Sequence, residues 1–133
     1  MAYFLAKTEP GTYSIDDLKR DQQTEWDGVR NPAAVNAIKS MRPGDKVIIY
    51  HSGSDRAVVG LAEVTSDPRP AENDNRSWVM DVKYVQHARQ PVTLAQVKTS
   101  GRFDDMALVR QGRLSTMSVP DAFWSWLQEQ GAF

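Results

Sequence analysis

The chain has 133 residues, the length of one domain, and we expect a single domain over residues 1–133. Its net charge of −1 argues against a protein that holds long duplexes mainly through phosphates, so any nucleic-acid contact must use a local patch or a pocket. The absence of cysteine excludes disulfides, thiol nucleophiles and thiolate zinc sites.

Neither a targeting segment nor a membrane span is visible in the sequence. No basic segment followed by a long apolar run opens the chain, so we see no signal peptide. No window approaches the roughly 20 apolar residues that a membrane-spanning helix needs. We therefore expect a soluble, cytoplasmic monomer that has no membrane partner.

The first half of the chain is predicted to alternate strands with helices. In order, we expect a strand at residues 3–8, a short helical turn from a Ser14 cap through Leu18, a helix from Pro32 that ends before Pro43, and a strand at residues 46–51. Ser14 and Asp17 have the spacing of a helix N-cap. Asn31 is a good cap for the second helix, and Pro32 suits its first position, where the missing N–H costs nothing.

The second half is predicted to be mainly strands, with a helix at its end. In order, we expect strands at residues 57–65 and 77–86, a short helix capped by Thr93 through Lys98, an irregular segment at residues 101–113, a strand at residues 114–119 and a helix at residues 120–130. Gly60, inside a strand, predicts a bulge or a close backbone approach. In the last helix Phe123, Trp124 and Leu127 are predicted to face inward. These elements predict a compact α+β domain on a mostly antiparallel or mixed, curled sheet.

Few residues offer catalytic chemistry. His51 and Ser52 are adjacent, but neighbouring strand residues point to opposite faces and rarely form a nucleophile–base pair. No GxSxG elbow surrounds Ser52, and the other histidine, His87, lies too far along the chain to indicate a metal site. No glycine-rich phosphate loop occurs. We therefore predict a protein that is not an enzyme and that has no metal and no cofactor.

The stretch WDGVRNP, residues 26–32, gathers an indole, a carboxylate, a glycine, a guanidinium and an amide. Asn31 and Pro32 are explained by helix initiation, and Gly28 by a turn that needs a positive φ. Neither need explains Trp26. This indole could cover the edge of the core, or it could offer a free face on which a base stacks. The residues alone leave both readings open.

Several sequence blocks between Phe4 and Ser115 resemble a known family. In order they are FLAKTEP-x-x-YS-x-x-DL, WDGVRN followed by Asn36, MRPGDKVIIYHSG, VVGLAEV, PVTL-x-x-VK and M-x-LVRQGRLS. With these blocks the chain closely resembles the EVE domain. The resemblance implies a PUA-like fold, in which a curled, β-barrel-like sheet of mixed or antiparallel strands is flanked by short helices. It also implies a nucleic-acid partner, DNA or RNA, and a modified base, such as a modified cytosine, held in an aromatic-walled pocket.

The resemblance also implies the residues of this pocket. Trp26 would stack on the base, and because nothing local requires an indole there, we expect its removal to spare the fold. The other pocket residues would be Lys7, Thr8, Gly28, Val29, Asn31, Tyr50, His51, Ser52, Arg113, Leu114 and Ser115. Basic clusters flank the quoted blocks, and from them we expect Arg30 and Arg110 to contact phosphates at the rim.

The sequence thus predicts a non-catalytic module that takes one base, a modified one, into a pocket. Two alternatives from other classes remain open. One is an enzyme that acts on a modified nucleotide or small metabolite through His51, Ser52 and Lys7. The other is an interaction module whose tryptophan-rich surface docks a protein partner.

Overall fold

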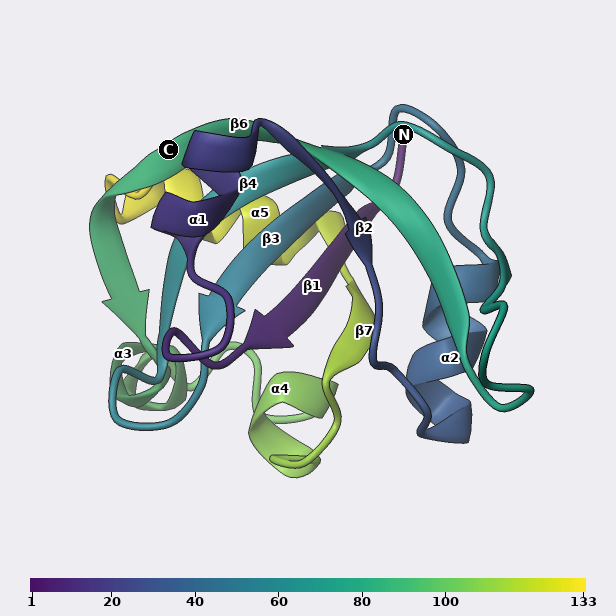
Figure 1. Cartoon of the computed structure of the whole chain (residues 1–133). Coiled ribbons are helices and arrows are strands. Elements are labelled where there is room, and N and C mark those ends of the chain that lie inside the picture. The colour runs from purple at the N-terminus through teal and green to yellow at the C-terminus, as the bar shows by residue number, and fades with distance from the viewer.

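A computed structural model describes all residues from Met1 to Phe133 and contains seven strands and five helices (Figure 1). In chain order the elements are β1 (Tyr3–Thr8), α1 (Ile15–Asp21), β2 (Gln23–Trp26), α2 (Pro32–Lys39), β3 (Lys46–His51), β4 (Ala57–Val64), β5 (Arg69–Pro70), β6 (Trp78–Thr93), α3 (Leu94–Ser100), α4 (Ala107–Arg110), β7 (Thr116–Val119) and α5 (Asp121–Glu129). Figure 1 shows α1 in front of the sheet and α5 behind it.

The strands form one mixed sheet in the order β2-β6-β4-β3-β1-β7, with the two-residue β5 beside β6. Only β1 and β3 run parallel, and the other pairs are antiparallel. The sheet curls, but β2 and β7 at its two ends do not pair, so it does not close into a barrel. The predicted α+β architecture is confirmed, and its sheet is barrel-like in curvature alone.

Helix α2 packs against both β6 and β7, and it thereby bridges the two ends of the open sheet. Its apolar face buries Ala34, Val35 and Ile38. As predicted, Asn31 caps it: the side-chain Oδ1 accepts hydrogen bonds from the N–H groups of Ala33 and Ala34. The loop that leaves β2 therefore turns directly into a helix start, and its path is held at both ends.

The other predicted helix starts are also confirmed. Ser14 and Asp17 form a capping box at α1, in which each side chain bonds the other residue's backbone N–H. Thr93 and Gln96 form the same arrangement at α3. Because each box joins groups three residues apart, the local sequence is sufficient to specify it.

Two strands differ from prediction. The segment Gln23–Trp26, for which no strand was predicted, is the edge strand β2, where Trp26 lies opposite Met80 of β6. Only one of its four residues is buried, so it lacks the apolar alternation of a strand. Strand β6 runs on to Thr93 rather than ending at residue 86, because its second half pairs with the start of β4.

In α5 the predicted inward face is correct for Phe123 and Leu127 and wrong for Trp124. Trp126, 4% exposed, is the tryptophan that joins the core. Trp124 is half-buried and stacks between Tyr3 and Phe133, with ring centroids 5.1 and 5.0 Å away. The helical spacing from Phe123 to Trp126 places both rings on one face.

Gly60 is needed where α1 sits on the sheet. The register of β4 shifts beside it, which confirms the predicted irregularity. A Cβ at this position would lie 2.4 Å from Ile15 Cδ1 and 3.0 Å from the carbonyl oxygen of Gln86. The Ile15 side chain thus packs directly on the backbone of β4, which anchors α1 and the loop that precedes it.

We expect Gly60→Ala to lower the free energy of unfolding by about 1–3 kcal/mol, because the added methyl overpacks this contact. Urea unfolding of both proteins measures the difference. Gly11→Ala is the matched control, since nothing lies within 4 Å of a Cβ at Gly11 and its backbone is not in the left-handed region. Equal stability of the two variants would show that Ile15 can move away at no cost.

Candidate functional site

A cavity of about 420 Å³ opens where the two ends of the sheet face one another. We call it the base cavity. Its lining residues come from the end of β1, the β1–α1 loop, β2 with the loop that follows it, and the residue before β7. They are Lys7, Thr8, Thr12, Tyr13, Thr24, Glu25, Trp26, Asp27, Gly28, Val29 and Ser115.

Backbone hydrogen bonds hold these segments in place. The N–H of Lys7 donates to the carbonyl of Ser115 at 2.7 Å, which extends the β1–β7 pairing to the cavity. The hydroxyl of Thr8 donates to the carbonyl of Tyr13 at 2.7 Å and fixes the loop after β1. Gly28 adopts φ +79°, a conformation that favours glycine, so the predicted turn after β2 is confirmed.

Two aromatic rings form a corner of the cavity. Tyr13 and Trp26 meet edge to face, with centroids 6.4 Å apart and an angle of 87° between their planes. The hydroxyl of Tyr13 donates to Asp21 Oδ2 at 2.8 Å. Burial, and next this hydrogen bond, raise the pKa of Tyr13, so its hydroxyl keeps its proton. Tyr13 is half-buried, and its ring is therefore the more accessible of the two.

Trp26 belongs to the core as well as to the cavity. It is 7% exposed and packs within the main cluster of buried side chains. This burial argues against the expectation that its removal would spare the fold. Trp26 ends the edge strand β2, and the residues before and after it are exposed, so the sequence around it resembles a loop.

Lys7 brings a cation to the cavity. Its Nζ donates to the carbonyl of Gly112 at 2.9 Å and lies 5.6 Å from the centre of the Tyr50 ring. Burial lowers the pKa of Lys7 and raises that of Tyr50. Tyr50 does not line the cavity itself, and it contacts Lys7, which does.

Six of the residues implied by the resemblance line the base cavity. They are Lys7, Thr8, Trp26, Gly28, Val29 and Ser115. Six others do not line it: Asn31, Tyr50, His51, Ser52, Arg113 and Leu114. Asn31 is occupied as a helix cap, Leu114 is buried in the core, and Arg113 is exposed. The backbone N–H of Ser52 donates to the carbonyl oxygen of Thr8, so Ser52 lies directly behind a residue that lines the cavity.

His51 has a structural position in the fold. It is 6% exposed, and its Nε2 accepts a hydrogen bond from the backbone N–H of Ile15 at 3.1 Å. The ring proton is therefore on Nδ1, which donates to Asp55 Oδ2 at 3.2 Å. Both nitrogens are occupied, and the ring joins the end of β3 to the start of α1.

The two predicted rim arginines already have partners. Arg30 Nε lies 2.7 Å from Asp74 Oδ2, and Arg110 lies 2.9 Å from Asp105 Oδ1. A phosphate at either arginine would have to compete with a carboxylate. The contacts predicted for them therefore remain predictions.

Sequence reasoning missed five residues of the base cavity: Thr12, Tyr13, Thr24, Glu25 and Asp27. Tyr13 stands inside the first quoted block, so the resemblance contained a signal for it. Thr24 and Glu25 had none, because β2 was not recognised as a strand. The lining as a whole combines an aromatic corner with hydroxyl, carboxylate and ammonium groups, and this mixture suits a flat ring with hydrogen-bonding edges.

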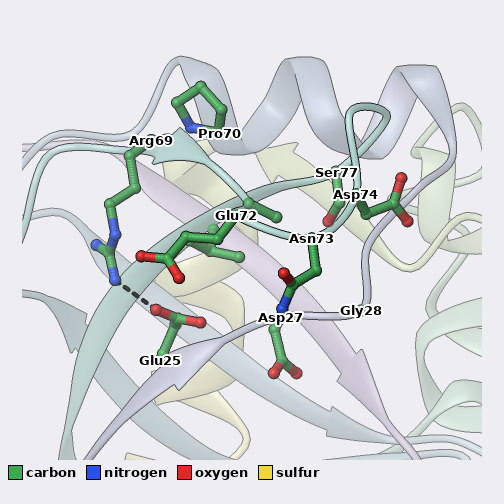
Figure 2. A pocket seen from close by; sticks show the side chains of 11 residues that line it. Glu25, Asp27, Gly28, Arg69, Pro70, Glu72, Asn73, Asp74 and Ser77 are labelled. Carbon is green, nitrogen blue, oxygen red and sulfur yellow. Dashed lines mark hydrogen bonds and ion pairs between the residues drawn. The ribbon is translucent and has the colours of Figure 1, made fainter.

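A second cavity, of about 570 Å³, lies between β2 and the segment that carries β5 (Figure 2). Four carboxylates and one arginine are among its lining residues: Glu25, Asp27, Glu72, Asp74 and Arg69. Arg69 bonds Glu25 at 2.6 Å, the dashed contact in Figure 2, and Asp81 at 3.1 Å. We call this the acidic cavity. Its charge disfavours phosphate.

No group of three or more histidine, cysteine or acidic side chains is placed to hold a metal ion. No helix is both long enough and apolar enough to cross a membrane. Arg69 pairs with Glu25 in the acidic cavity, and Tyr13 of the base cavity donates to Asp21.

Comparisons with known proteins establish the family and the fold. The EVE domain family matches residues 2–130, so the chain belongs to the EVE domain family. Among curated proteins, human thymocyte nuclear protein 1 is 29% identical over an alignment that covers 86% of this chain and 67% of the human protein. The family assignment and the α+β, PUA-like fold predicted from the sequence are thus confirmed.

Solved structures share the fold along the whole chain. A protein from Rhodopseudomonas palustris is 35% identical, with a TM-score of 0.91 over 98% of this chain and 93% of that one. The human THYN1 protein, solved in complex with 5-methylcytosine containing DNA, is 24% identical, with a TM-score of 0.88 over 100% of this chain and 98% of that one. At this identity the human structure establishes likeness of fold.

For His51, we expect His51→Ala to lower the free energy of unfolding by about 1–3 kcal/mol, because the buried N–H of Ile15 loses its acceptor. His87→Ala is the control. Its Nε2 pairs at 2.6 Å with Asp16, whose side chain is 84% exposed, and exposed pairs contribute about 0–1 kcal/mol. Urea unfolding of both variants measures the contrast. A His51→Ala protein as stable as wild type would contradict the structural role.

Proposed function

We propose that the chain binds nucleic acid and takes one base, a modified base such as 5-methylcytosine, into the base cavity. The observation that carries this proposal is the aromatic corner of Tyr13 and Trp26, set among polar groups in a cavity between the ends of the sheet. Membership of the EVE family supports it. The human THYN1 protein, which has the same fold, forms a complex with 5-methylcytosine containing DNA, and this supports the choice of ligand.

The size and lining of the cavity fit a single base. About 420 Å³ lies within the range of small-ligand sites. A base can reach such a site only after it leaves its stack, and a base flipped in this way exposes its edges and any added methyl group. The apolar wall of Tyr13, Trp26 and Val29 would contact the ring face and the methyl group. One buried methyl contributes about 1 kcal/mol, so apolar contact alone gives modest discrimination.

The polar residues suit an amino-bearing base. The carboxylate of Asp27 can accept a hydrogen bond from an exocyclic amino group, whereas that of Glu25 is already bonded to Arg69. The ammonium of Lys7 can donate to a ring carbonyl, since it offers three donors and Gly112 takes one. Cytosine and its 5-substituted forms carry both an amino group and a carbonyl, so both edges would be satisfied. A base that lacked the amino group would leave the Asp27 carboxylate without this donor, which costs binding free energy.

We propose that the chain recognises the base and does not catalyse a reaction on it. The residues of the enzyme alternative, His51, Ser52 and Lys7, do not converge on one space. His51 bonds Ile15 and Asp55, and neither His51 nor Ser52 lines the base cavity. Lys7 alone reaches the cavity, and its ammonium is bonded to Gly112. A base held in the base cavity would contact hydrogen-bonding groups and aromatic ring faces.

We expect Tyr13→Ala to weaken binding of an oligonucleotide that contains 5-methylcytosine by roughly five- to 150-fold, because a stacking or edge contact with the base is lost. Tyr13→Phe should retain most of the affinity, since the ring remains. Fluorescence titration with modified and unmodified oligonucleotides gives the affinities. Tyr3→Ala is the matched control: Tyr3 is also half-buried and stacks on Trp124, away from the cavity. Equal loss in the two alanine variants would contradict the proposed site.

Trp26→Ala should affect both the fold and the site. Because its indole is buried, we expect the free energy of unfolding to fall by about 3–5 kcal/mol. The protein that remains folded should also lose its preference for the modified base, since one side of the cavity is gone. Urea unfolding and binding titration are performed on the same preparation. If folded Trp26→Ala kept wild-type preference, Trp26 would be a core residue and no part of the site.

A further inference from the structure

A second aromatic side chain, Trp78 at the start of β6, stands among cations outside the base cavity. Two hollows adjoin it. One, of about 500 Å³, is lined by Lys39, Arg42, Asp67, Pro68 and Trp78. The other, of about 380 Å³, is lined mainly by polar and basic side chains from α2 and from the loops before α2 and β6, with Arg30, Asn36, Lys39, Arg76 and Trp78 among them. We call the two hollows together the Trp78 surface.

The ring of Trp78 is half-buried and packs against the core. The ammonium of Lys39 lies over it, with Nζ 4.8 Å from the ring centre. Lys39 is exposed and has no carboxylate partner, so its position over the ring depends on this contact. A base stacked on an indole is held more strongly than an exposed ammonium over the same ring. A base can therefore displace Lys39.

The charges of this surface are complementary to a nucleic-acid backbone. Four cations and one carboxylate line the two hollows: Arg30, Lys39, Arg42, Arg76 and Asp67. Of the four cations, only Arg30 is in an ion pair, with Asp74. The acidic cavity has the opposite balance, with four carboxylates and one arginine. Electrostatics thus directs a polyanionic strand to the Trp78 surface and away from the acidic cavity.

One loop connects the Trp78 surface to the base cavity. Gly28 and Val29 line the base cavity, whereas Arg30, the next residue, and Pro32, two residues further on, line the Trp78 surface. Consecutive Cα atoms are about 3.8 Å apart, so the two sites are separated by the width of this loop. A strand whose base enters the cavity and whose backbone crosses the loop reaches Arg30 first and Trp78 next.

We propose that the Trp78 surface binds a nucleotide next to the captured one in an unpaired strand. Its base stacks on Trp78 in place of the Lys39 ammonium, and its phosphates lie against Lys39, Arg42 and Arg76. The proposal rests on the proposed function, because it places the two sites on one strand. Stacking on an indole accepts any base, so this second site adds affinity without adding sequence preference.

The first test compares Trp78→Ala with wild type on single-stranded oligonucleotides, in DNA and RNA form, each with and without one 5-methylcytosine. We expect affinity for modified and unmodified strands to fall by the same factor, roughly five- to 150-fold. Trp78→Phe should keep part of the affinity. Trp124→Ala is the matched control, because Trp124 is also half-buried and stacks on Tyr3 and Phe133. It should bind as wild type does.

A second test leaves the Trp78 ring in place, so its result does not depend on whether Trp78→Ala folds. Lys39→Gln and Arg76→Gln change exposed side chains that make no ion pair. Each should reduce the slope of log affinity against log salt by about 0.7, the value for one lost phosphate contact on a single strand. Lys19→Gln, on α1, removes an exposed cation without an ion pair from another region and should leave the slope unchanged.

The outcomes separate the two proposals. Binding of the free nucleoside 5-methyl-2′-deoxycytidine should be weakened by Tyr13→Ala and left unchanged by Trp78→Ala, because a nucleoside has no phosphates with which to bind the cations of the Trp78 surface. If Trp78→Ala and Lys39→Gln bind oligonucleotides as wild type does, the Trp78 surface is not a binding site. If wild type shows no preference for the modified base, but Trp78→Ala and Lys39→Gln bind oligonucleotides more weakly than wild type, the base-reading function fails and the Trp78 surface stands. Wild type that binds no strand overturns both.

Discussion

The absence of pairing between β2 and β7 is the constraint on which this molecule depends. A sheet that curls this far leaves two edges facing each other, with unpaired backbone groups on both. Helix α2 fills one part of the opening by packing on β6 and β7. The base cavity lies at another part, where the Lys7–Ser115 bond extends the β1–β7 pairing to the cavity. A closed barrel of the same strands would have no space there, so the site exists because the sheet is incomplete.

The parts of the fold that sequence reasoning predicts are those specified within a few residues. The caps at Ser14, Asn31 and Thr93 are hydrogen bonds between near neighbours, and their residue types are sufficient to locate them. Strand β2 and the far half of β6 are specified by partners elsewhere in the chain, such as Met80 opposite Trp26. Their own residues are polar, and no local pattern indicates such pairings.

The site divides in the same way. Family blocks locate Lys7, Gly28 and Val29 in the cavity, but a block does not say which way a side chain points. His51 sits in a quoted block and faces Ile15 instead of the cavity. Trp26 was expected to stack on the base because no local need explained an indole there, and the ring nevertheless turns inward from an edge strand. Orientation of this kind comes from the sheet's curvature, which no short stretch of sequence contains.

The pairing of β1 with β3 and β7 also has a consequence for synthesis. Strand β1 lies between β3, which comes some forty residues later, and β7, which comes much later still, and Lys7 bonds Gly112 across 105 residues. A nascent chain leaving the ribosome therefore cannot complete its sheet until β7 has emerged. Contacts so distant along the chain also slow folding. The cavity wall that joins Lys7 to Ser115 is thus among the last features to form, and a chain interrupted before β7 has the aromatic corner without the opposite wall.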